Sequence, residues 1–352
     1  MNKLTKLLST ITILLLLQSC GDDLPVENPP RGDYEHGYFI VNEGPFSNGS
    51  GTLTFVDNDQ EVYQNVYKSV NDNEDLGNIA QSMYLHSNSA FIVVNNSHQI
   101  IVTDRYTMAK IAVIEGTNIN NPRFFVAVGN TGYVSNWGNA TDPTDDFISI
   151  INLETNTISG TIEVGEGPED MLVVGDKIYV NLQGGYNQNN KVAVIETASN
   201  TLSTSIVVGD VPNSIVKDSN GNIWVLCGGK PNWTGSESVG KLVKIVGQSV
   251  ETTLDFALGD HPEHLSIDGG KLYYNLSGKV RGLSTNDTML NTDEMPGLDG
   301  NYYAMKAENG MLYTTNAADF ASEGTLSVFD LSTSTLSYSL STGIIPTFIS
   351  FQ

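Results

Sequence analysis

Amide and aromatic side chains recur in this sequence directly after short apolar segments, where a chain leaving a strand would turn. Amides donate and accept hydrogen bonds, and indole or phenol rings offer flat surfaces for stacking. Several such side chains on one face are typical of a site for a polar ligand. The candidates at this kind of position are Asn42, Glu43, Asn95, Asn96, Asn136, Trp137, Gln183, Tyr186, Lys230, Trp233, Asn275 and Asn316.

The asparagines among these candidates also have a simpler explanation. Asn tolerates left-handed backbone angles and hydrogen-bonds its own loop, so turn formation accounts for any single one of them. Large aromatic side chains are unusual on loops unless they pack against something. We therefore favour a binding role for Trp137 and Trp233 over a purely local one.

A second group of candidates stands just before other apolar segments, in "NNPRFF", "GDHPEHL", "LDGNYYAM" and "IIPTF". The side chains concerned are Arg123, His261, His264, Tyr302 and Tyr303. Two histidines three residues apart could coordinate a metal ion, but no third ligand accompanies His261 and His264. We therefore predict ordinary loop histidines and no metal site.

Two loops are rich in carboxylates, which are the ligands that Ca²⁺ prefers. One contains Asp142, Asp145 and Asp146, and the other contains Asp72, Glu74 and Asp75. Neither has the spacing of a calcium-binding loop. Solvated acidic loops are therefore the better interpretation of both.

No catalytic motif occurs in the chain: G-x-S-x-G, H-E-x-x-H, C-x-x-C and the phosphate-binding loop are all missing. The only catalytic constellation that the sequence offers is His261, Glu263 and His264. We therefore expect a binding protein rather than an enzyme. Cys227 is one of two cysteines in the chain, and we assign it no role beyond that of a small buried apolar residue.

The elements that must position these side chains form an internal repeat of roughly 40–50 residues, the length of a four-stranded propeller blade. In each repeat, short β-branched or aromatic runs are bounded by turn residues. Seven second strands can be aligned: "YFIVN", "AFIVVN", "GYVSN", "IYVNL", "IWVLC", "LYYNL" and "LYTTN". Seven third strands follow them: "TLTFVD", "QIIVTD", "FISIINL", "KVAVIE", "KLVKIV", "KVRGLS" and "TLSVFDL".

The C-terminal segment "PTFISFQ" has the pattern of a first strand, although the chain ends there. Only six first strands precede it, and the unit that begins at Tyr38 lacks one. We therefore predict an all-β, seven-bladed propeller that closes when the C-terminal strand pairs into the first blade, which removes two open sheet edges. The sixth unit, "KVRGLSTNDTMLNTDEMPGLDG", fits the repeat least well, and we expect a different local geometry there.

The N-terminal segment predicts export. Lys3 and Lys6 precede an apolar run from Leu7 to Leu17, which is typical of a signal peptide over residues 1–19. Cys20 follows as the expected lipidation site, with a flexible Pro-rich tether over 20–36 and the propeller over 37–352. Without residues 1–19 the chain carries 15 basic and 40 acidic residues, a net charge of -25. So acidic a chain is a poor partner for nucleic acid.

These features resemble the YVTN-type, YncE-like propeller repeats. The residues that carry the resemblance are the Gly-x-x-Pro openings, such as Gly165–Pro168 and Gly209–Pro212, the "YVN"-like second strands, and "VIET" or "VFDLSTSTL" after the third strand. Leu17-Gln18-Ser19-Cys20 resembles a lipobox, and Gly21-Asp22-Asp23 resembles the surface-export signal of Bacteroidetes lipoproteins. Together they are similar to the cobalamin-capture (BtuG-type) lipoproteins.

That resemblance implies a surface-exposed outer-membrane lipoprotein that binds a cobamide such as cobalamin and passes it to a TonB-dependent transporter, with no cofactor of its own. Propellers host unrelated activities, so two other classes stay open. One is a protein-interaction or structural module of the cell surface. The other is a lyase or a lactonase-like enzyme.

Overall fold

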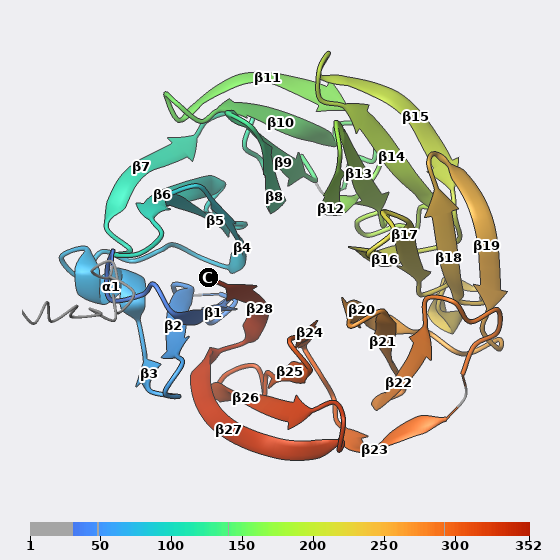
Figure 1. The fold of residues 1–352 in the computed structure, drawn as a ribbon. Helices are drawn as coiled ribbons and strands as arrows, with labels where there is room; N and C mark the ends of the chain where they lie inside the picture. The colour runs from blue at the N-terminus through green and yellow to red at the C-terminus, as the bar shows by residue number, and fades with distance from the viewer. Residues whose placement is uncertain (1–30, 48, 140, 292) are drawn as a thin grey trace, which may run out of the picture.

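Seven four-stranded antiparallel sheets surround a central channel (Figure 1). This computed structural model describes residues 31–352 apart from 48, 140 and 292. The predicted fold class, an all-β seven-bladed propeller closed by the C-terminal strand, is confirmed. The expected signal peptide over 1–19 and the expected lipidation site Cys20 lie outside the described residues.

In every blade the first strand lies at the channel and the fourth lies at the rim. From the channel outward, blade 1 contains β28 (Pro346–Phe351), β1 (Gly37–Asn42), β2 (Thr52–Asp57) and β3 (Val62–Tyr63); blade 2 contains β4 (Ala80–His86), β5 (Ser89–Val94), β6 (Gln99–Asp104) and β7 (Lys110–Glu115); blade 3 contains β8 (Pro122–Val128), β9 (Thr131–Asn136), β10 (Phe147–Asn152) and β11 (Thr157–Glu163). Blade 4 contains β12 (Pro168–Val174), β13 (Lys177–Leu182), β14 (Lys191–Glu196) and β15 (Thr201–Val207).

Blade 5 contains β16 (Pro212–Lys217), β17 (Ile223–Cys227), β18 (Lys241–Val246) and β19 (Ser249–Asp255); blade 6 contains β20 (Glu263–Asp268), β21 (Lys271–Leu276), β22 (Lys279–Ser284) and β23 (Glu294–Asp299); blade 7 contains β24 (Ala304–Glu308), β25 (Met311–Asn316), β26 (Glu323–Asp330) and β27 (Thr335–Ile344).

The hydrophobic core lies between neighbouring blades, because both faces of each second strand are covered. In β1, Phe39 and Val41 belong to the cluster shared with blade 2, whereas Tyr38 and Ile40 belong to the cluster shared with blade 7. Successive side chains of a strand point to opposite faces, so a strand buried on both sides needs a continuous apolar run. That is why the second strands were the clearest part of the repeat.

The ring closes through β28 and β1, which pair antiparallel from Tyr38 opposite Phe351 to Asn42 opposite Pro346. The rings of Tyr38 and Phe351 also pack together, with centroids 5.6 Å apart. Figure 1 shows the end of the chain at the inner edge of the ring, with β28 beside β1. The two ends of the chain therefore complete one blade between them.

Two blades depart from the regular pattern on their outer edges. In blade 6, β22 and β23 pair at only two positions with a register shift between them, as the weak sixth repeat led us to expect. In blade 1, the outer strand β3 has two residues, and the short helix α1 (Val66–Val70) follows it. Val66 and Tyr67 of α1 are buried in the cluster shared by blades 1 and 2.

The last part of the expected tether, residues 31–36, contacts the propeller through Tyr34 and Arg31. Tyr34 is buried and packs edge-on against Phe55, with ring centroids 5.2 Å apart. The guanidinium of Arg31 lies 4.1 Å from the centroid of the Tyr106 ring. A single aromatic residue in a polar, Pro-rich stretch was too weak a signal to place this segment on the core.

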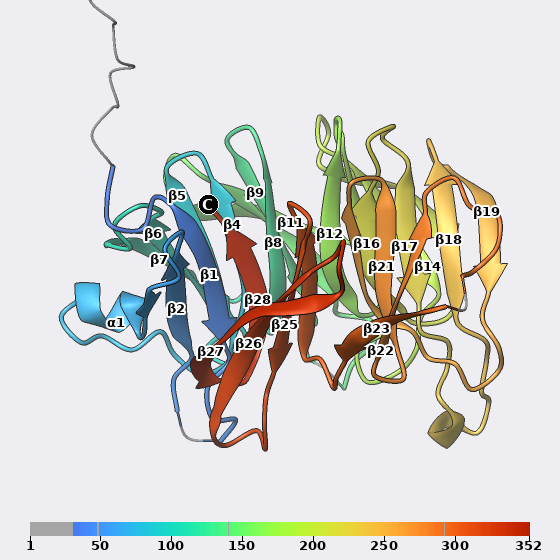
Figure 2. The ribbon, with the colours of Figure 1, turned by 60° about the horizontal axis from the view of Figure 1, so that its bottom comes forward.

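The two faces of the ring carry different parts of the chain (Figure 2). Gln352 donates to the carbonyl oxygen of Tyr34 at 2.6 Å, so the C-terminus and residues 31–36 share one face. The 3₁₀ helix η1 (Asn232–Thr234) projects from the opposite face, where the inner strands begin. In the part of the chain that the structure describes, no helix is long and apolar enough to cross a membrane.

Deletion of residues 346–352 tests the closure. Loss of β28 exposes the edge of β1 and removes apolar contacts of blade 1 with blades 2 and 7. The truncated chain is therefore expected to unfold or aggregate. Thermal unfolding followed by circular dichroism measures this. The matched control removes Gln352 alone, which keeps every β28–β1 pair. A native melting temperature for the longer deletion would refute the closure.

Candidate functional site

One polar side chain from each blade stands where the inner strand begins, at the mouth of the channel. We call this set the axial ring; its members are Gln81, Arg123, Glu169, Asn213, His264, Tyr303 and Thr347. Parts of the ring are bonded directly to one another. Arg123 donates to Gln81 Oε1 at 2.6 Å and to Glu169 Oε1 at 2.9 Å.

A residue with a left-handed backbone precedes the inner strand in five of the blades. These residues, at φ between 55° and 69°, are Ile79, Asn121, Gly167, Val211 and Ile345. In each case its carbonyl oxygen accepts the backbone N–H of the residue that follows the second strand, at 2.8–3.2 Å. The residues held in this way are Asn95, Trp137, Gln183, Gly228 and Glu43. The loops after the second strands are therefore fixed against the axial ring.

Such a conformation is strained for a β-branched side chain, and three of the five residues are Ile or Val. Four of them stand directly before the proline that opens the inner strand, as Ile345 stands before Pro346. Proline fits the first position of a strand, where its missing N–H costs no ladder bond. Three of the Gly-x-x-Pro openings, Gly165–Pro168, Gly209–Pro212 and Gly343–Pro346, therefore mark these turns, whereas Gly259–Pro262 in blade 6 does not.

Arg123 is the centre of a rigid group on one side of the axial ring. Its guanidinium lies 4.4 Å from the centroid of the Trp137 ring, and Tyr186 meets Trp137 edge-on at 6.0 Å. Glu169 is almost fully buried, so desolvation raises its pKa while the charge of Arg123 counteracts that shift. A buried carboxylate needs such a partner, since an unpaired one would be very costly.

Glu43 links the axial ring across the closing blade. The hydroxyl of Tyr303 donates to Glu43 Oε1 at 3.1 Å, and the hydroxyl of Thr347 also bonds to this carboxyl. Burial raises the pKa of Glu43, and these bonds together with the charge of Arg123 oppose the rise. Tyr303 and Thr347 come from blades 7 and 1, so this contact depends on closure.

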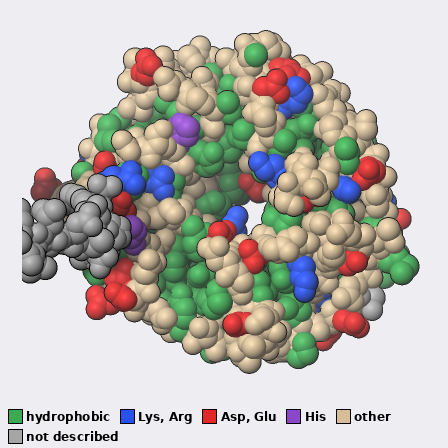
Figure 3. All heavy atoms as spheres, in the orientation of Figure 1, with side chains coloured by type: hydrophobic (Ala, Val, Ile, Leu, Met, Phe, Trp, Pro, Cys, Tyr) green, Lys and Arg blue, Asp and Glu red, His purple; other side chains and the backbone are tan. Residues whose placement is uncertain are grey.

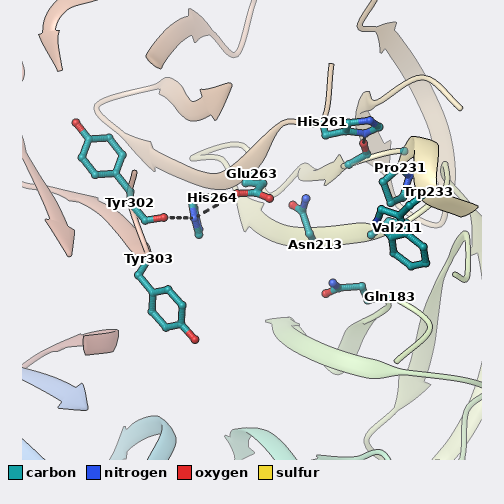
Figure 4. A pocket seen from close by; sticks show the side chains of 12 residues that line it. Gln183, Val211, Asn213, Pro231, Trp233, His261, Glu263, His264, Tyr302 and Tyr303 are labelled. Atoms are coloured by element: carbon teal, nitrogen blue, oxygen red, sulfur yellow. Dashed lines mark hydrogen bonds and ion pairs between the residues drawn. The ribbon is translucent and has the colours of Figure 1, made fainter. Parts of the chain in front are cut away.

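A cavity of about 540 Å³ opens beside the axial ring, between blades 4 and 7 (Figure 4). Tyr303 and Gln183 project toward its middle from opposite sides, and Asn213 lies between them at its edge. Trp233 stands at the rim with 77% of its surface exposed. The full lining is Gln183, Val211, Asn213, Gly228, Gly229, Pro231, Trp233, His261, Glu263, His264, Tyr302 and Tyr303. Two amides, two phenols, two imidazoles and an indole thus make up most of the lining, as a polar ligand with a broad apolar surface requires.

The two histidines of this cavity are held by backbone carbonyls. His264 donates from Nε2 to the carbonyl oxygen of Tyr302 at 3.1 Å, and burial lowers its pKa, so the ring is neutral near pH 7. His261 donates from Nδ1 to Gly228 at 2.7 Å, and its Nε2 lies 3.4 Å from Glu237. The described residues contain no group of three or more His, Cys, Asp or Glu side chains arranged to hold a metal ion.

The structure gathers six of the predicted residues at this cavity: Gln183, Trp233, His261, His264, Tyr302 and Tyr303. Glu43, Arg123, Trp137 and Tyr186 lie in the adjoining groups just described. Lys230 does not line the cavity; its Nζ is 3.8 Å from Asp210. Sequence reasoning missed Gln81, Glu169 and Asn213, whose only signal was their position at the start of an inner strand.

Several predicted asparagines are used inside the fold and are corrections to the predicted surface. Asn42, Asn95 and Asn136 are buried, and their side chains donate to groups of their own or the next blade. Asn275 is buried and accepts the N–H of Gly278. The remaining two form local contacts at the surface: Asn316 accepts from Ala318, and Asn96 donates to Asn78. Turn and strand chemistry explains all six.

The carboxylates of the two acidic loops bond within their own surroundings. Asp145 accepts the N–H of Asn139, and Asp142 accepts the hydroxyl of Thr144. Asp146 is buried, accepts the N–H of Gly167 at 2.5 Å, and has its pKa raised to about 6 by desolvation. In the other loop, Glu74 and Asp75 form ion pairs with lysines.

Residues 36–257 match the family model described as a domain of unknown function (DUF5074). Curated proteins gave no match. Among solved structures, the chain is similar to the Pseudomonas aeruginosa periplasmic gluconolactonase, with TM-score 0.64, 11% identity, and 89% of this chain and 99% of that chain covered. It is also similar to a putative 6-phosphogluconolactonase from Bacteroides fragilis, with TM-score 0.64 and 12% identity, and with 92% of this chain and 100% of that chain covered. For hydrazine synthase from Kuenenia stuttgartiensis the TM-score is 0.58 and the identity 16%, with 76% of this chain and 88% of that chain covered. Such low identities establish the fold alone.

Gly167 tests the importance of the left-handed turns. A Cβ at this residue, whose φ is +69°, would lie 2.2 Å from the backbone nitrogens of Gly184 and Gly185. We expect Gly167→Ala to lower the free energy of unfolding by about 3 kcal/mol, from backbone strain together with overpacking. Urea denaturation measures the loss. Gly175→Ala is the matched control, because Gly175 has φ +63° and open space around it, so only about 1 kcal/mol should be lost. Equal effects would show that the close approach at Gly167 is unimportant.

Proposed function

The chain belongs to the DUF5074 family, and we propose that it captures a nutrient ligand in the cavity beside the axial ring. The observation that carries this proposal is the lining of that cavity. Neutral hydrogen-bonding groups from Gln183, Asn213, His264 and Tyr303 face a space of about 540 Å³, and the exposed indole of Trp233 stands at its edge. An indole so exposed offers a flat surface on which a ligand can stack.

A cobamide such as cobalamin is the ligand that we propose. The sequence resembles the cobalamin-capture lipoproteins, and a cobamide presents side-chain amides around a broad apolar macrocycle. Amides and phenols would hydrogen-bond the former, and Trp233 and Tyr302 would pack against the latter. The lining contains one carboxylate, that of Glu263, and no Lys or Arg. The proposed contacts therefore use neutral groups of the ligand.

We further propose that Cys20 anchors the chain to the outer membrane and that a TonB-dependent transporter receives the ligand. Residues 31–36, the first that the structure describes, lie on the face opposite the cavity. A lipid at Cys20 would therefore attach to the ring from that side and leave the mouth of the cavity accessible. This arrangement supports capture from the medium.

Titration with cyanocobalamin, followed by isothermal calorimetry, tests the proposal. We expect saturable binding that Trp233→Ala weakens at least about tenfold, because the indole loses its stacking contact. Leu336→Ala is the matched control: this side chain is 55% exposed and lies in β27, away from the cavity. If no heat is released at high micromolar ligand, cobamide capture is refuted.

The second candidate function is lactone hydrolysis, favoured by the lactonases among the similar structures and by the pair of Glu263 and His264, 3.8 Å apart in the cavity. Hydrolysis of gluconolactone that His264→Asn abolishes would support it over capture. Recovery of surface proteins other than a transporter, after cross-linking on cells, would instead support an interaction module.

A further inference from the structure

The channel contains a second cavity, of about 360 Å³, that shares no lining residue with the first. It is bounded by the inner strands β4, β8, β12, β24 and β28, and it extends toward the face that carries Gln352. Figure 3 shows hydrophobic side chains gathered around the inner edge of the ring on that face. The capture site makes no use of this space.

One wall of this channel cavity is aromatic and aliphatic. Phe124 and Phe348 meet edge-on with ring centroids 6.3 Å apart, and both are only partly buried. Tyr84 and Leu85 continue the wall along β4 and are also partly exposed. Water against these rings is unfavourable, so an apolar group that displaced it would gain free energy.

The other wall is charged, with Asp170 on β12 and Lys306 and Glu308 on β24. Lys306 and Glu308 are two residues apart on one strand and therefore point to the same side. Among the described residues, neither of their side chains has a hydrogen bond or ion pair. Asp170 accepts the N–H of Met171 at 2.8 Å; burial raises its pKa to about 6, and the charge of Lys306 opposes that shift. Three charged groups thus face one space, and among the described residues none of them forms an ion pair.

We propose that this channel cavity binds a free amino acid with an aromatic or large aliphatic side chain. The ammonium group of such a ligand would lie between Asp170 and Glu308, its carboxylate would meet Lys306, and its side chain would pack on Phe124 and Phe348. The carboxylates of Asp170 and Glu308 thus match the ammonium group of a zwitterion, and the ammonium group of Lys306 matches its carboxylate. The inner strands are also the edges of their sheets, so their free backbone groups add hydrogen-bonding partners.

Calorimetric titration of the chain without residues 1–19 with L-phenylalanine tests this site, with 2-phenylethylamine and 3-phenylpropionate as ligands that each lack one charged group. We expect saturable binding of L-phenylalanine and binding of either analogue that is at least about tenfold weaker. Lys306→Met should weaken the binding of L-phenylalanine and leave the binding of 2-phenylethylamine unchanged. Lowering the pH from about 7 to about 5 should weaken the binding of 2-phenylethylamine, because Asp170 becomes protonated.

Lys217→Met is the matched control, since Lys217 is an exposed lysine on the inner strand β16 and does not line the cavity. The proposal is overturned if L-phenylalanine shows no saturable binding at millimolar concentration, or if Lys306→Met and Lys217→Met bind it equally. Cyanocobalamin titration of Lys306→Met should match that of the unmodified chain, so the two sites can fail independently.

Discussion

Backbone pairing between β28 and β1 holds the two ends of the chain together, and the position of every other blade depends on it. Each blade buries its apolar faces only against its neighbours, so an open ring would expose two of them. The same pairing also reaches the functional face. Ile345, just before β28, accepts the N–H of Glu43 at 2.9 Å, and Thr347 contacts the Glu43 carboxyl. Closure and the completion of the axial ring are therefore one event.

The left-handed turns before the inner strands fix the loops that surround the site. A β-branched residue in this conformation costs on the order of 1–2 kcal/mol, and Ile79, Val211 and Ile345 all adopt it. In return, each carbonyl points sideways into the loop after the second strand and fixes that loop by a hydrogen bond. Blades 6 and 7 lack this turn at the equivalent position, and the larger cavity opens beside them. Where the repeated turn is absent, the loops leave room.

The sequence predicted the architecture because each second strand is buried on both faces and a proline is the first residue of the inner strand in blades 1, 3, 4 and 5. Pro346 and the apolar residues after it were enough to predict the closing strand. The site was harder to predict. Asn42 and Trp137 both stand at the end of an apolar run, yet the Asn42 amide is buried between strands, whereas the Trp137 ring packs against the Arg123 guanidinium beside the cavity. A shift of one residue along the strand decides this, and only the register shows it.

Glu169 and Asn213 were missed for a related reason. A bulge separates the first residue of β12 and of β16 from the regular ladder, so alternation along these two strands does not reveal which side chain faces the axis. Tyr34 was missed because its partners, Phe39 and Phe55, lie in other elements. Contacts between distant parts of the chain leave no local pattern.

The two cavities differ in their chemistry as well as their place. The cavity beside the axial ring is lined mainly by neutral polar and aromatic groups, and the channel cavity combines an aromatic wall with three charges. The central claim is that the first of them is the capture site. Hydrogen exchange with and without cyanocobalamin tests it most directly. The account predicts slower exchange in residues 211–213, 228–233 and 261–264, with the outer strands unchanged; protection confined to the outer strands, or none at all, would contradict it.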